Sequence, residues 1–119
     1  MSTAKFNQWL NSDGTENYKC RAWVNFNGTG TVAIRASGNV TSITDNGTGD
    51  YTVNFTTAMP DANYSTLISS KAVSGSNSTS GQINFSDTEL VRSVRLWFSS
   101  LTSSGTGTDR ATVNVAIFR

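Results

Sequence analysis

Tight-turn sequences divide the segment from residue 20 to residue 64 into short runs in which apolar and polar residues alternate. The turn sequences are Asn27-Gly28-Thr29-Gly30, Ser37-Gly38-Asn39 and Asp45-Asn46-Gly47-Thr48-Gly49-Asp50. Asn-Gly between alternating runs favours a β-hairpin, because both central residues of the tight turn need a positive φ. The segment therefore predicts antiparallel strands that are joined by tight turns.

The composition favours the same kind of fold over the whole chain. Ser, Thr, Asn and Gly make up nearly half of the 119 residues, a mixture that disfavours long helices. Twelve aromatic residues lie within the alternating runs, which indicates a packed domain rather than a disordered chain. About seven or eight short strands with regularly spaced turns indicate an all-β protein, a sandwich or a small barrel. We expect an antiparallel β-sandwich.

The alternation also predicts which side chains are buried. In the first strand it places Tyr18, Cys20, Ala22, Val24 and Phe26 on one face and Lys19, Arg21, Trp23 and Asn25 on the other. Elsewhere the expected core residues are Val32, Ile34, Val53, Phe55, Val113, Val115 and Ile117. A single cysteine allows no intrachain disulfide, so we expect Cys20 to be a small buried apolar residue.

Arg92 interrupts an otherwise apolar run from Leu90 to Phe98. It falls in register with the apolar residues on either side of it. Either a β-bulge shifts the register at this point, or Arg92 faces a partner.

Residues 1–17 form a separate lead-in before the predicted head domain of residues 18–119. Phe6, Trp9 and Leu10 have the spacing that one helical turn would gather on one face, and a turn is expected at residues 12–15. Two interpretations of Trp9 stay open. It caps the core of its own domain, or it packs with Phe6 and Leu10 against neighbouring subunits or a carrier protein.

Several classes of function lack the residues that they need. The chain has no histidine, so the commonest general base and most transition-metal sites are missing. Residues 45–50 resemble a calcium loop only faintly, without its further acidic ligands, and a hairpin turn is expected there. A net charge of +1 gives no electrostatic case for binding nucleic acid, and no apolar run is long enough to span a membrane. We expect no enzyme, no cofactor, no metal, no nucleic-acid partner and no membrane insertion.

The amino-acid sequence of the turn-rich segment resembles that of a known family. The matching residues are Trp23-Val24-Asn25-Phe26-Asn27-Gly28-Thr29-Gly30-Thr31, Ser42-Ile43-Thr44-Asp45-Asn46-Gly47, Tyr51-Thr52-Val53-Asn54-Phe55 and Met59-Pro60-Asp61. They resemble a module at the C-terminal ends of bacteriophage tail-fibre and tail-fibre-like proteins, notably of phages that infect cyanobacteria and other marine bacteria. The match covers a little over a third of the chain. It implies a virion surface protein, made in the bacterial cytoplasm and assembled as a homotrimer.

From this resemblance we expect the terminal domain of a tail fibre, or an adhesin at its tip, that contacts the host cell surface and its polysaccharide or receptor. The main alternative is a capsid decoration or cement protein, or a tail-apparatus component, that binds other virion proteins. A host-range lectin without stable attachment to the virion is a third class.

Two long polar loops, at residues 74–81 and 99–109, are the predicted contact with the host receptor. The candidate contact residues are Ser76, Asn77, Ser78, Thr102, Thr106 and Asp109. We expect these loops to cluster at one exposed end of the domain, opposite the lead-in. The alternative is that they are simple connections between strands.

Overall fold

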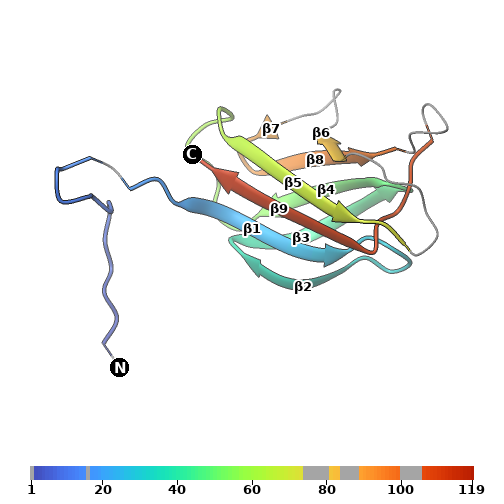
Figure 1. Ribbon diagram of the computed structural model, residues 1–119, viewed down its shortest axis with the longest axis horizontal. Helices are drawn as coiled ribbons and strands as arrows, with labels where there is room; N and C mark the ends of the chain where they lie inside the picture. The colour runs from blue at the N-terminus through green and yellow to red at the C-terminus, as the bar shows by residue number, and fades with distance from the viewer. Residues whose placement is uncertain (1, 16, 74–80, 84–88, 100–105) are drawn as a thin grey trace.

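The computed structural model describes residues 2–15, 17–73, 81–83, 89–99 and 106–119, which form a β-sandwich with a projecting N-terminal segment (Figure 1). The strands are β1 Cys20–Asn27, β2 Ala33–Gly38, β3 Val40–Gly47, β4 Asp50–Phe55, β5 Ser65–Lys71, β6 Gly81–Ile83, β7 Glu89–Leu90, β8 Ser93–Phe98 and β9 Thr112–Phe118. The described residues contain no helix. The predicted all-β class is therefore confirmed.

The strands form two antiparallel sheets. One has the order β2-β1-β9-β5, and the other has the order β3-β4-β8-β6, with the two-residue strand β7 also paired to β8. The sheets face each other across one hydrophobic core, and this arrangement confirms the predicted sandwich.

The core comes mainly from alternate residues of the four central strands. Buried residues are Ala22, Val24 and Phe26 of β1, Tyr51, Val53 and Phe55 of β4, Val94, Leu96 and Phe98 of β8, and Val113, Val115 and Ile117 of β9. The predicted burial is confirmed for the residues of β4 and β9. Val32 and Ile34 are only partly buried and pack against the edge of this core.

Two of the predicted turns differ in what they connect. Thr48 and Gly49 join β3 to β4 as a hairpin, and Gly49 has a φ of 71°, which glycine adopts without a steric penalty. In contrast, Asn39 joins β2 to β3 across the two sheets. Its side-chain oxygen accepts a hydrogen bond from Thr57 N, and its amide nitrogen donates to Arg21 O. The turn at residues 37–39 is therefore a corner between sheets rather than a hairpin.

The predicted burial of Cys20 is wrong. Cys20 is exposed at the start of β1, and Tyr18, which precedes the strand, is exposed as well. The register between β1 and β9 shifts between Cys20 and Ala22, so the regular alternation of faces begins only at Ala22.

Arg92 does not lie at a bulge, the first of the two predicted settings, and the second, contact with a partner, stays a prediction. Val91 and Arg92 form the turn between β7 and β8, which pair with each other as a short hairpin. The side chain of Arg92 is exposed, and its carbonyl oxygen accepts a hydrogen bond from Phe55 N at 2.9 Å. The position of Arg92 is thus set by the backbone of a turn and not by a bulge within one strand.

The lead-in projects away from the sandwich, and the predicted helical turn is absent from its described residues (Figure 1). The turn predicted at residues 12–15 is confirmed, and Asn17 N donates to Trp9 O at 2.7 Å across it. The radius of gyration is 16.0 Å, above the roughly 13–14 Å expected for a compact chain of this length. Trp9 therefore does not cap the core of its own domain in this structure.

Candidate functional site

The outer face of the β2-β1-β9-β5 sheet carries two adjacent rows of side chains, one polar and one apolar. The polar row consists of Asn25 on β1, Asn114 on β9 and Ser69 on β5, which are paired directly in the strand register. The apolar row, two residues further along each strand, consists of Trp23, Ala116 and Leu67. Their chain neighbours face the core, so these six side chains point to the outside. We call these six residues the outer-face groove.

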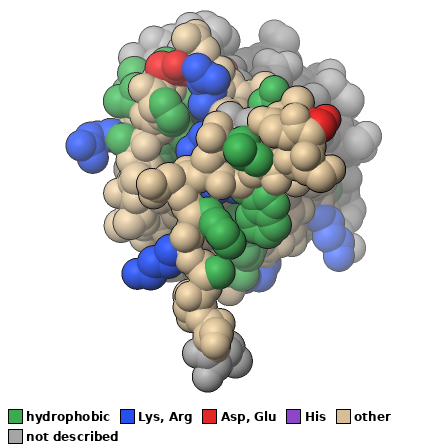
Figure 2. Space-filling model, turned by 90° about the vertical axis from the view of Figure 1, so that its left-hand side faces the viewer, with side chains coloured by type: hydrophobic (Ala, Val, Ile, Leu, Met, Phe, Trp, Pro, Cys, Tyr) green, Lys and Arg blue, Asp and Glu red, His purple; other side chains and the backbone are tan. Residues whose placement is uncertain are grey.

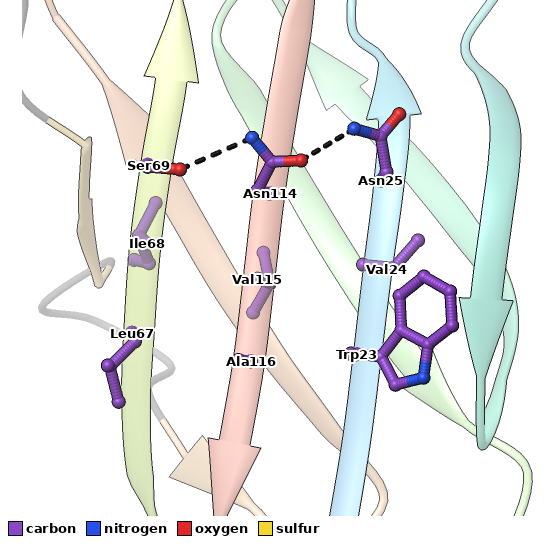
Figure 3. Close-up of a pocket in the computed structure, with 9 residues that line it drawn as sticks. All are labelled: Trp23, Val24, Asn25, Leu67, Ile68, Ser69, Asn114, Val115 and Ala116. Atoms are coloured by element: carbon purple, nitrogen blue, oxygen red, sulfur yellow. Dashed lines mark hydrogen bonds between the residues drawn. The ribbon is translucent and has the colours of Figure 1, made fainter. Parts of the chain in front are cut away.

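The polar row is a continuous chain of hydrogen bonds (Figure 3). The side-chain amide of Asn25 donates to Asn114 Oδ1 at 2.6 Å, and the amide of Asn114 donates to Ser69 Oγ at 3.2 Å. Each amide group has two N–H bonds and each carbonyl oxygen two lone pairs, so these bonds leave donors and acceptors free in the row. The row can therefore hydrogen-bond a polar ligand without giving up its internal bonds.

The apolar row is hollowed at its centre because a small residue lies between two large ones. Ala116 separates Trp23, which is 44% exposed, from Leu67, which is 54% exposed. The hollow has a volume of about 590 Å³ and is open to solvent. In Figure 3 Leu67 lies on the β5 side of the hollow, and the indole of Trp23 lies beside β1 on the side of β2.

Gly38 on β2 allows the indole of Trp23 to lie against the sheet. The two residues are paired in the register, and a Cβ atom at Gly38 would collide with Trp23 Nε1. Any larger residue at this position would push the indole out of its place. The neighbouring strand therefore helps to fix the position of an exposed aromatic ring.

None of the side chains that line the hollow is charged. Arg35 on β2 lies beside the polar row, and its side chain reaches toward the start of β9. Its Nη2 donates to Ala111 O at 2.7 Å, and its Nη1 lies 3.4 Å from both Asn25 Oδ1 and Thr112 Oγ1. The groove thus combines an aromatic ring, an apolar floor and neutral hydrogen-bonding groups.

The other sheet has an outward-facing tryptophan too, but its surroundings differ. Trp97 on β8 is half-buried, and a Cβ atom at Gly107 would lie 3.1 Å from its ring. On the same face Arg95 and Asp50 form an ion pair with an N–O distance of 2.7 Å. This pairing lowers the pKa of Asp50, since the carboxylate accepts hydrogen bonds from the guanidinium. This second face carries an ion pair, and its tryptophan is only half-exposed.

The predicted receptor loops are described only in part. Ser76, Asn77, Ser78 and Thr102 lie outside the described residues, and Thr106 is exposed. Asp109 is half-buried, and its Oδ1 accepts a hydrogen bond from Gly49 N at 2.8 Å and one from the Tyr51 hydroxyl at 2.9 Å. The side chain of Asp109 is thus engaged inside the domain. Its role in receptor contact stays a prediction.

The described strands fix where these loops begin and end. β5 ends at Lys71, β8 ends at Phe98 and β9 begins at Thr112, all at the end of the sandwich opposite the lead-in (Figure 1). The predicted interface residues Phe6, Trp9 and Leu10 lie at the other end. The clustering of the loops themselves concerns residues outside the described ranges.

Among the described residues there is no group of three or more potential metal-binding side chains. Likewise, this part of the chain has no helix that is long and apolar enough to cross a membrane.

Sequence reasoning placed Trp23 and Asn25 on the outward face of the first strand, but it did not connect them to residues 67, 69, 114 and 116. The missing information was the strand register.

Comparisons of this chain with protein-family models, with curated proteins and with solved structures found no significant match.

Proposed function

We propose that this protein is a surface component of a bacteriophage virion, the terminal domain of a tail fibre or an adhesin at its tip, which contacts the host cell surface. The resemblance of residues 23–61 to tail-fibre modules supports the virion setting. The structural observation that carries the proposal is the exposed apolar cluster on the projecting lead-in, because it is suited to attach the domain to a larger assembly.

This cluster consists of Phe6, Trp9 and Leu10, which are 67%, 58% and 47% exposed. The rings of Phe6 and Trp9 pack together at a centroid distance of 6.3 Å, and the three residues border one small hollow. Figure 2 views the molecule from the end that bears the lead-in and shows exposed hydrophobic side chains there. Apolar surface gathered in this way typically marks an interaction site.

Local hydrogen bonds order a turn of the lead-in next to this cluster. Asp13 Oδ1 accepts bonds from the backbone nitrogen and the hydroxyl of Thr15, and Asn11 N donates to Thr15 O at 2.7 Å. An ordered turn beside an exposed cluster limits the conformational entropy that docking would cost. This geometry favours attachment through the lead-in, with the sandwich facing outward.

The same cluster also supports a second function, that of a capsid decoration, cement or tail-apparatus protein. In that case the lead-in would bind another virion protein, and the sandwich would have no receptor. The two functions differ in where the protein lies in the particle.

Imaging of labelled particles tests the proposal. An antibody or gold label against the sandwich should mark the distal ends of the tail fibres. A label on the capsid shell would favour the decoration function, and particles without the protein would refute both. The triple variant Phe6→Ser, Trp9→Ser, Leu10→Ser should abolish incorporation, whereas Leu90→Ser, which changes an exposed apolar residue of the sandwich, should leave it intact.

A further inference from the structure

We propose that the outer-face groove is a binding site for a neutral polysaccharide, and that this site lies on the sheet rather than on the loops at the end of the sandwich. The inference rests on the proposed function for its biological setting. The side chains of the groove favour this ligand whatever the biological setting.

The apolar row is suited to the hydrophobic face of a sugar ring. Pyranose rings present C–H groups on one face, and these pack on the π-face of an aromatic ring, whose charge distribution attracts the positive edges of C–H bonds. Trp23 offers such a face, and Gly38 leaves room for its indole to lie against the sheet. Ala116 leaves room beside the indole, and Leu67 closes the far side.

The polar row is suited to the hydroxyl groups of the same ligand. Asn25, Asn114 and Ser69 lie on three neighbouring strands, so the row spans about 10 Å, which is close to the length of two linked pyranose rings. Sugar hydroxyls donate and accept hydrogen bonds, as do amides and a serine hydroxyl. The parallel apolar and polar rows therefore match the two kinds of surface on an oligosaccharide that lies across the strands.

The charge of the groove selects the class of polysaccharide. The lining has no acidic or basic side chain, and the guanidinium of Arg35 beside it already donates to Ala111 O. An ionic group of a ligand would find no side chain of opposite charge in the lining of the hollow, so it would gain no ion pair there. This favours neutral hexoses over uronic acids or sulfated sugars.

Because the groove is open, we expect weak binding at each site. Overall binding would be stronger when several copies of the protein contact repeated units of one polysaccharide. We therefore choose two-dimensional NMR with the ¹⁵N-labelled full chain, because it detects weak complexes and identifies the residues that contact the ligand. The probes are neutral oligosaccharides of two to six glucose, galactose or mannose units, with uronic-acid and sulfated oligosaccharides for comparison. Binding of a neutral oligosaccharide should shift the signals of Trp23, Asn114 and Ala116.

Variants then test the groove directly. Trp23→Ala should weaken binding about tenfold, the effect of losing one good stacking contact. Ala116→Arg fills the hollow from an outward position and should abolish binding. If Trp23→Ala proves unstable, Ala116→Arg keeps the test intact. The matched control is Asn54→Ala, because Asn54 makes similar hydrogen bonds to Ser42 and Thr44 on the outer face of the other sheet.

Several outcomes would overturn the inference. These are shifts confined to the loop end, at Lys71 and Thr106; stronger binding of the acidic or sulfated probes; or no shift with any neutral probe. Dissociation of an oligomer by Ala116→Arg without any sugar binding would identify the groove as a subunit interface instead. If the protein bound sugar but were missing from the particle, the proposed function would be refuted, and the groove would still be a sugar-binding site.

Discussion

Tyr51 connects three segments at the end of the sandwich from which the long polar loops leave. Its ring is fully buried, and its hydroxyl lies 2.6 Å from Gly28 O and 2.9 Å from Asp109 Oδ1. Burial raises the pKa of Tyr51, and the adjacent Asp109 carboxylate raises it further. The hydroxyl therefore stays protonated, and its single hydrogen serves these two acceptors.

The substitution Tyr51→Phe removes this hydroxyl and keeps the ring, so the packing against Phe26 and Phe98 is retained. The lost hydrogen bond, together with the unsatisfied carbonyl of Gly28, should lower the free energy of unfolding by about 1–3 kcal/mol. Asp109 loses less, because its Oδ1 keeps the bond from Gly49 N. For a domain of this size, the midpoint of thermal unfolding should fall by roughly 5–10 °C.

Thermal unfolding followed by circular dichroism, and urea unfolding for the free energy, would measure this loss. The matched control is Tyr18→Phe, because Tyr18 is 82% exposed and its hydroxyl faces water. We expect the control to melt with the parent protein. Suppose instead that Tyr51→Phe melts at the same temperature as the parent, and that its free energy of unfolding falls with urea concentration in the same way. The hydroxyl would then contribute nothing to joining these segments, which would refute the prediction.

Three further predictions concern charge and assembly. Nε and Nη2 of the fully buried Arg110 have no hydrogen-bond partner in the described part of the chain, so Arg110→Met should raise the free energy of unfolding by about 1–3 kcal/mol; a lower melting temperature would contradict this. Arg95 lowers the pKa of Asp50, so the ionised carboxylate stabilises the folded state. This contribution to the free energy of unfolding is complete above the ordinary carboxyl pKa of about 4, and it is lost as the pH falls through the lowered pKa. The difference in melting temperature between the parent and Asp50→Asn should therefore shrink below about pH 4, and a constant difference would exclude this linkage. We expect a stable trimer by light scattering that Trp9→Ala dissociates; a parent protein that is already monomeric at micromolar concentration would refute this.

Alternation and turn chemistry predicted the strands that form the centre of the fold. In β4 and β9 every second residue is apolar, and these residues are buried because both strands lie inside a sheet and face the opposite layer. The same reasoning failed at Cys20, where a register shift precedes the regular part of β1. It failed at the lead-in as well, where a helical spacing of three apolar residues had no surface of its own domain to pack against.

The connection between β2 and β3 shows a second limit. Gly38-Asn39 has the residues of a tight turn, and Asn39 adopts a φ of 56° as such a turn requires. However, Asn39 also bonds to Arg21 O and Thr57 O, which hold the chain where it passes from one sheet to the other. Local chemistry therefore predicted the reversal of direction, while tertiary hydrogen bonds determined which strands it joins.

The outer-face groove depends on contacts that local sequence cannot specify. Asn25 and Asn114 are 89 residues apart, and they meet only because β1 and β9 are neighbours in this register. A shift of one residue would turn Trp23 or Ala116 into the core, where an indole would overfill the space and a methyl group would leave a void. The burial of Val24 and Val115 on the opposite face therefore fixes the register that forms the groove. Changes to the six groove residues can consequently alter ligand binding with little effect on the core, which is the separation of stability and specificity that a variable binding surface needs.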